Sequence, residues 1–139
     1  MIDNMKSCCR ENNCIKCCLK TRMPLSNQDV KRIKRLGFDT EFFITLKNGW
    51  FQLKNKDGRC VFNNGFMCLI YKDRPEGCKF YPILYDKDEN KAVFDKDCPY
   101  KDSFKISKRT TEELFALVLR LECERTNRKI INNSNKSRN

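Results

Sequence analysis

The sequence predicts a small α+β domain in which short irregular strands and loops lie between an N-terminal helix and a long C-terminal helix. The chain has 139 residues, which is enough for one domain and too few for two cores of ordinary size. Hydrophobic residues make up 40% of it and charged residues 34%, so the core is modest and needs further stabilisation. Apolar residues follow a helical spacing near both ends, whereas turn signals separate short apolar runs in the middle.

The N-terminal helix is predicted over residues 27–36. Ser26 can cap its first amides, and Asp29 follows three residues later, where a carboxylate suits the positive helix end. Apolar residues then recur every three positions, at Val30, Ile33 and Leu36. Gly37 follows the last of them and is typical of a helix end.

Short strands and tight turns are predicted for the middle of the chain, where asparagine, aspartate and glycine separate the apolar runs. In chain order these elements are a helical stretch over 40–46, a strand near 50–53, a turn at 56–58, a hairpin with arms 60–62 and 68–71, and a strand pair over 79–85 and 91–95. The hairpin turn is Asn63-Asn64-Gly65, and a cysteine stands near the start of each arm.

The strongest helix signal covers residues 111–128. Thr110 and Glu113 match a capping box at its start. One face of this helix carries apolar residues that should lie on the core, namely Leu114, Leu117, Val118 and Leu121. Cys123 falls on the opposite side of the helical wheel, so we expect it to bind nothing.

We expect a single domain over residues 1–131 and a disordered polar tail over 132–139. The first six residues are polar and charged, unlike a secretion signal. The longest apolar run, residues 114–119, is far shorter than the ~20 residues that a membrane-spanning helix needs. These features predict a cytoplasmic protein that does not enter a membrane.

Cysteine is the residue that can supply the missing stabilisation, because there are ten cysteines and no histidine. The cytosol keeps thiols reduced, so this number favours metal ligation or redox chemistry over a disulfide framework. Cys14 and Cys17 form a C-x2-C element, which places two thiolates around one tight turn. The adjacent Cys17 and Cys18 point to opposite sides of an extended backbone, which indicates that they serve different roles.

Eight cysteines form the predicted set of metal ligands. They are Cys9, Cys14, Cys17, Cys18, Cys60, Cys68, Cys78 and Cys98. Eight is the number that two four-thiolate sites require, and one site with spare thiols is the alternative. Cys8 is the alternative to Cys9. Zinc and a [4Fe-4S] iron-sulfur cluster both accept ligation by cysteine alone.

The residues before Cys78 have a predicted role in placing it. Pro75 and Gly77 fit the second and fourth positions of a type I turn, which would aim Cys78 inward. Arg74 can donate hydrogen bonds to a thiolate or a sulfide and so belongs to the predicted cofactor site. The alternative is that Arg74 is an ordinary surface arginine.

These residues resemble the YkgJ-like cysteine-cluster family. Its pattern is C-x2-C-x2-C-C, then C-x-F, then C-x-I-Y-x-x-R-P-x-x-C-R-x-F-P, and often a further Cys-Pro. The chain carries the corresponding segments Cys14-x2-Cys17-Cys18, Cys60-Val61-Phe62, Cys68 to Pro82 and Cys98-Pro99. It differs in a longer spacing before Cys14 and in Lys79 and Tyr81, where arginine and phenylalanine are usual. The resemblance implies a zinc- or iron-chelating domain.

We favour a [4Fe-4S] cluster, chiefly through this resemblance, with a redox or protein-modification-related role. The flagellin lysine N-methylase, a longer relative in that family, is associated with such a cluster. The alternative is a zinc-stapled binding module without enzymatic activity. The net charge of +11 suits an acidic protein partner, or RNA as the less favoured choice. The lack of histidine excludes a Ser/His/Asp triad, and five glycines supply no phosphate-binding loop.

Overall fold

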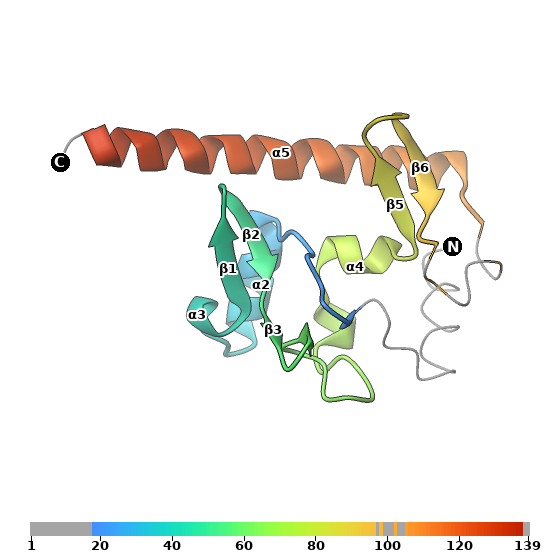
Figure 1. Cartoon of the computed structure of the whole chain (residues 1–139), viewed down its shortest axis with the longest axis horizontal. Helices are drawn as coiled ribbons and strands as arrows, with labels where there is room; N and C mark the ends of the chain where they lie inside the picture. Colours follow the sequence, from blue (N-terminus) through green and yellow to red (C-terminus); the bar gives the residue numbers. More distant parts are fainter. Residues whose placement is uncertain (1–17, 97, 99–101, 103–104, 138–139) are drawn as a thin grey trace.

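A computed structural model of the chain describes residues 18–96, 98, 102 and 105–137 (Figure 1). The described part has the predicted α+β class. Its helices are α2 (Asn27–Arg35), α3 (Thr40–Phe43), the 3-10 helix η2 (Tyr71–Asp73), α4 (Glu76–Phe80) and α5 (Lys108–Ser137). Its strands are β1 (Ile44–Lys47), β2 (Trp50–Leu53), β3 (Asn55–Lys56), β4 (Arg59–Cys60), β5 (Ile83–Asp86) and β6 (Lys91–Phe94).

The described strands form three separate antiparallel pairs, β1–β2, β3–β4 and β5–β6. Ile44 lies opposite Leu53 in the first pair, and Ile83 lies opposite Phe94 in the third. A single two-stranded hairpin is marginally stable in water, so each pair depends on what packs against it. Figure 1 shows α5 along one side of the molecule, with β5 and β6 near its N-terminal half and the tip of β1–β2 near its C-terminal half.

Helix α2 begins with the predicted cap. The backbone N–H of Asp29 donates to the hydroxyl of Ser26, and the N–H of Ser26 donates back to the Asp29 carboxylate, both at 3.0 Å. The next helix is shorter than predicted, because α3 ends at Phe43 and Ile44 starts strand β1. β-Branched Ile44 and Thr45 favour the extended backbone, and their ladder with β2 satisfies the polar groups that a longer helix would have used.

The predicted hairpin with arms 60–62 and 68–71 is reduced to one antiparallel bridge between Asn63 and Cys68. Asparagine side chains take up the amides of the connecting loop instead. Gly65 N–H donates to the Asn63 side chain at 2.8 Å, and the N–H groups of Phe66 and Met67 donate to Asn64. Such local bonds compete with a strand ladder and explain why it stops after one pair.

Residues 76–80 form helix α4, where the sequence predicts a type I turn and then a strand. Pro75 occupies the N-cap, and the Cys78 N–H donates to the Pro75 carbonyl at 3.0 Å. Proline is tolerated at a helix start because the N–H that it lacks would have no partner there. The strand pair therefore begins at Ile83 rather than at residue 79, and β5 and β6 otherwise follow the prediction.

Helix α5 is longer than predicted at both ends. It starts at Lys108, and the Ser107 hydroxyl accepts the Thr110 N–H at 3.0 Å, so Ser107 is the cap rather than Thr110. The helical backbone continues through residues 132–137, where a disordered tail was expected. No glycine or proline interrupts that stretch, so helix propagation has no stop signal. Within the described residues, no helix has the length and apolar composition of a membrane span.

The core has two parts. Leu114, Leu117 and Leu121 of α5 pack with Phe80 and Ile83, which confirms the predicted leucine face. The second part joins α2, α3, β2 and the cysteine-bearing loop, through Leu25, Ile33, Phe43, Leu53, Cys60, Phe62 and Ile70. Burial of each large apolar side chain contributes about 1.5–3 kcal/mol. Cys60 is therefore one of the buried side chains of the second core.

Arginines of α5 fasten this helix to the distant β1–β2 turn. Arg125 donates to the Asn48 carbonyl at 2.8 Å, and Arg128 donates to the Gly49 carbonyl at 3.0 Å. Gly49 has φ +84°, and a Cβ there would lie 2.7 Å from the Lys129 side chain. Only glycine fits this contact between the turn and the helix.

Asp29 connects α2 with α4 through a buried carboxylate that is 1% exposed. It accepts a hydrogen bond from Arg32 at 2.7 Å and another from the backbone N–H of Glu76 at 3.0 Å. Arg32 also donates to the carbonyl oxygens of Asp73 and Arg74, at 3.2 and 2.9 Å. The segment that leads to Cys78 is thereby held against α2.

We predict that Asp29→Ala lowers the free energy of unfolding by about 3–5 kcal/mol, because it leaves buried backbone N–H donors and the Arg32 guanidinium without their acceptor. Urea unfolding measures this change. Glu113→Ala is the matched control, since Glu113 pairs with the exposed Arg109 at 3.0 Å, and removal of such a pair should cost about 0.5 kcal/mol. A loss below about 1 kcal/mol for Asp29→Ala would contradict the role given to this carboxylate.

Candidate metal centre

Four cysteines from separate segments lie within electrostatic reach of one another, and we call them the four-thiol cluster. They are Cys18, Cys60, Cys68 and Cys78. Burial raises the pKa of Cys78 well above its usual value, and negative charge on each of the other three raises it further. Charges in a protein interior influence one another over distances of several ångströms. The fold therefore places these four of the eight predicted ligands in the same region of the domain.

Cys18 reaches Cys60 through a strand-like contact. Leu19 forms an antiparallel bridge with Arg59, and the Lys20 N–H donates to the Gly58 carbonyl at 2.8 Å. Cys18 directly precedes Leu19 and Cys60 directly follows Arg59, so this isolated bridge brings the two cysteines near each other. The segment that follows Cys18 is thus fixed on the β3–β4 hairpin, far from it in sequence.

Cys60 and Cys68 have the same local geometry. The backbone N–H of Phe62 donates to the Cys60 sulfur, and the N–H of Ile70 donates to the Cys68 sulfur. In each case the donor lies two residues after the cysteine. Hydrogen bonds to the ionised form favour a thiolate, so both loops are shaped to stabilise negative sulfur. The repeated order of cysteine, any residue and a large apolar residue is the sequence signal for this geometry.

Cys78 is placed by helix α4, which packs closely on the segment that follows Cys18. A Cβ on Gly77 would overlap the sulfur of Met23, so a larger residue would require the Met23 side chain or the helix to shift. The Glu76 carboxylate holds the other side, because it accepts from the Ser26 hydroxyl at 2.9 Å and from Arg120 of α5 at 3.1 Å. Three separate elements thus define the position of α4.

Burial controls the protonation of these thiols. It raises the pKa of Cys60 from 9.0 to about 12 and the pKa of Cys68 from 9.0 to about 11, against the opposing effect of the backbone N–H donors. The negative charges of neighbouring cysteines contribute to the rise of both pKa values. At neutral pH these groups are thiols, and a metal that binds them must displace their protons.

Arg74 lies beside the four-thiol cluster and lowers the pKa of both Cys68 and Cys78. The alternative of a surface arginine is wrong, because Arg74 is 6% exposed. Its guanidinium stacks 4.2 Å from the centre of the Tyr71 ring and donates to the Tyr71 carbonyl at 2.7 Å. A buried cation fixed in this way offsets part of the charge of the thiolates.

The other predicted ligands are not all within the described part of the chain. Cys9, Cys14 and Cys17 lie outside it, as does Cys8. Cys98 is 3% exposed, and its N–H donates to the Asp95 carbonyl at 3.3 Å. Cys123 is exposed on α5, as predicted from the helical wheel.

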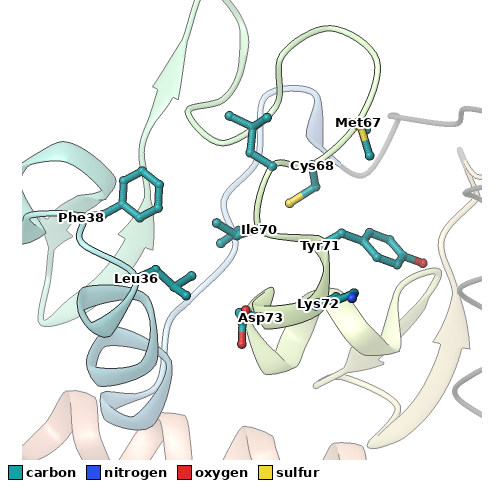
Figure 2. Close-up of a pocket in the computed structure, with 9 residues that line it drawn as sticks. Leu36, Phe38, Met67, Cys68, Ile70, Tyr71, Lys72 and Asp73 are labelled. Carbon is teal, nitrogen blue, oxygen red and sulfur yellow. The ribbon is translucent and has the colours of Figure 1, made fainter.

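Cys68 also lines an open pocket of about 390 Å³. In Figure 2, Leu36 and Phe38 lie on one side of it and Cys68 and Tyr71 on the other, with Ile70 between them. This pocket gives the edge of the four-thiol cluster access to solvent.

The donor chemistry of the four-thiol cluster fits a metal that prefers thiolates. Among residues 18–96, 98, 102 and 105–137, no group of three or more cysteine, aspartate or glutamate side chains forms a ready-made metal site. The cluster nevertheless offers four sulfur donors, backbone N–H donors to two of them and a nearby arginine. Cysteine sulfur is the preferred ligand of iron-sulfur clusters and of structural zinc.

A comparison of the sequence with protein families gives a match. A family model named "CxxCxxCC: Putative zinc- or iron-chelating domain" matches residues 8–99, which is more than half of the chain. The chain belongs to this family. The matched range of the CxxCxxCC domain contains the whole four-thiol cluster as well as Arg74. A search of curated proteins found no match, and a search of solved structures found none.

We predict that the metal-free CxxCxxCC domain loses stability as pH rises from about 9 towards 11. In that window the unfolded chain releases the protons of Cys60 and Cys68, whereas the folded chain keeps them until pH reaches about 12 and about 11. The folded state then binds more protons, so its free energy of unfolding falls by roughly 1 kcal/mol per pH unit for each thiol.

Urea unfolding with a chelator, between pH 8 and 10.5, measures this slope. Cys60→Ser should make the slope shallower, and Cys123→Ser, which changes an exposed thiol, should leave it as it is. Equal slopes for the Cys60 variant and the unmodified chain would contradict the burial effect.

Proposed function

We propose that the domain binds a metal centre through the thiolates of the four-thiol cluster and that this centre is a [4Fe-4S] cluster. Its role would be electron transfer or support of a protein-modification reaction. The observation that carries the proposal is that three cysteines from other segments act electrostatically on Cys78. Four thiolates are the number that one such centre needs. The predicted ligands that remain, Cys9, Cys14, Cys17 and Cys98, equal the number for a second site.

Three features of the surroundings favour an iron-sulfur cluster. Phe62 and Ile70 are buried next to the ligands and would keep water away from the centre. Their backbone N–H groups donate to Cys60 and Cys68, and Arg74 adds a buried positive charge. Hydrogen bonds to sulfur, net charge and burial are the properties that set the reduction potential of such a cluster. Zinc has no redox chemistry that would use them.

Zinc is the second candidate, favoured by a separate observation. Cys60 is a member of the buried core that joins α2, α3 and β2. A zinc ion held by four thiolates at that place would staple a small core, which is the usual task of a closed zinc site. The domain would then be a binding module, and its net charge of +11 would favour an acidic protein or RNA as the partner.

Metal analysis of protein purified without oxygen separates the two candidates. An iron-sulfur domain should be brown, with a broad absorbance band near ~400 nm and equal amounts of iron and acid-labile sulfide. Colourless protein with stoichiometric zinc would overturn the iron-sulfur proposal and support the zinc-stapled module.

We predict that Cys78→Ser reduces the metal content at least about tenfold and lowers the yield of folded protein, because metal binding and folding are coupled in such sites. Cys123→Ser is the matched control and should keep the metal, since Cys123 is exposed on α5. Elemental analysis and circular dichroism measure the two effects. Full metal content in the Cys78 variant, or loss of metal in the Cys123 variant, would show that the ligand assignment is wrong.

A further inference from the structure

The buried amide of Asn63 has a hydrogen-bond donor that nothing in the described part of the chain satisfies. Asn63 is 6% exposed, and its Nδ2 is the buried side-chain polar atom left without a partner among the described residues. Buried donors are nearly always paired in folded proteins, because an unmet donor costs free energy. The Asn63 Nδ2 group is therefore available to donate a hydrogen bond to an acceptor that binds at the site.

The orientation of the amide is fixed by the loop. The Gly65 N–H donates to Asn63 Oδ1 at 2.8 Å, so the oxygen must occupy that end. Exchange of the amide oxygen and nitrogen would bring two donors together and leave the oxygen without a bond. Nδ2 is consequently the end of the amide that does not face the Gly65 N–H.

The amide lies next to the four-thiol cluster. Asn63 and Cys68 are directly opposite each other in an antiparallel bridge. Opposite side chains in such a pair project from the same face, with Cβ atoms about 4.5–5.5 Å apart. The Asn63 backbone N–H also donates to the Cys60 carbonyl at 2.9 Å, which ties this residue to a second cysteine of the cluster.

A protonated thiol is a weak acceptor, whereas a metal-bound thiolate carries charge and accepts strongly. We propose that Asn63 Nδ2 donates a hydrogen bond to the Cys68 thiolate when the centre is loaded, and thereby stabilises the metal–sulfur bond. This inference rests on the proposed metal site, but it holds for either metal. It assigns Asn63 as a positioning residue for the centre.

Cobalt(II) titration of the full chain tests the proposal, because thiolate-to-cobalt charge-transfer bands report on the electrons of the sulfur. Asn63→Asp keeps an oxygen for Gly65 but removes the donor, and Asn63→Leu removes the donor without adding charge. Both should shift the charge-transfer bands to lower energy and weaken cobalt binding about tenfold. Asn64→Asp is the matched control, since Asn64 makes the same kind of loop bonds, to Phe66 and Met67, and is exposed.

The outcomes separate this inference from the proposed function. Lack of thiolate bands in the unmodified chain would overturn the metal site and the role of Asn63 together. Thiolate bands that stay unchanged in both Asn63 variants would overturn the role of Asn63 alone. A shift in Asn63→Asp without one in Asn63→Leu would assign the effect to charge and would also overturn it.

A measurement on the unmodified chain covers the case in which the variants do not fold. After loading with an NMR-active cadmium isotope, an Asn63 side-chain proton should show scalar coupling to cadmium through the sulfur. The Ile70 N–H, which donates to the same Cys68 sulfur, is the internal control. Coupling to Ile70 without coupling to Asn63 would overturn the proposal, as expected if a water satisfies the amide instead.

Discussion

The buried Asp29 carboxylate is the constraint on which the rest of the site depends. A lone carboxylate that is 1% exposed would cost several kcal/mol, so every group that bonds to it is held firmly. Two of these groups are backbone amides, of Ser26 at the start of α2 and of Glu76 at the start of α4. The third is Arg32, whose guanidinium also donates to the carbonyl of Arg74 and so connects Asp29 with the segment before α4. The helix that carries Cys78 cannot shift without exposing this carboxylate or leaving it unpaired.

The thiols experience two opposing influences, and burial is the stronger. The backbone N–H groups of Phe62 and Ile70 favour ionised sulfur, and Arg74 does the same for Cys68, yet the pKa values of Cys60 and Cys68 still rise. The protein alone therefore does not supply enough positive potential to ionise these residues at neutral pH. A bound cation is the strongest local charge that such a site can receive. The fold brings the sulfurs near one another without ionising them, as is expected at a site where a bound cation would supply the missing charge.

Local signals in the sequence predicted the parts of the fold that local interactions determine. The Ser26 and Asp29 cap, the leucine face of α5 and the outward position of Cys123 all depend on neighbours within a few turns of helix. The cysteine pattern predicted eight ligands, and four of them, Cys18, Cys60, Cys68 and Cys78, act electrostatically on one another in the described part of the chain. The family match then supported that interpretation.

The remaining features depend on partners far away in sequence. The proximity of Cys18 and Cys60 rests on the bridge of Leu19 with Arg59, which no local pattern encodes. Helix α4 forms where a turn was predicted because Asp29 accepts the N–H of its first residue. The sequence predicted Asn63 to be a turn residue like Asn64, and only its burial beside Cys68 distinguishes it from the exposed Asn64. The sequence carries no signal that distinguishes a buried asparagine in a turn from an exposed one.

The contacts of α5 bear on the order in which the domain can be completed during synthesis. Arg120 bonds to Glu76, Glu124 accepts the Asn27 N–H at 2.8 Å, and Arg128 lies 3.7 Å from the centre of the Phe51 ring. This helix follows all of these partners in the chain, so none of the contacts exists until the ribosome has made it. The β1–β2 and β5–β6 pairs, which both contact α5, therefore gain this support only after α5 has been synthesised.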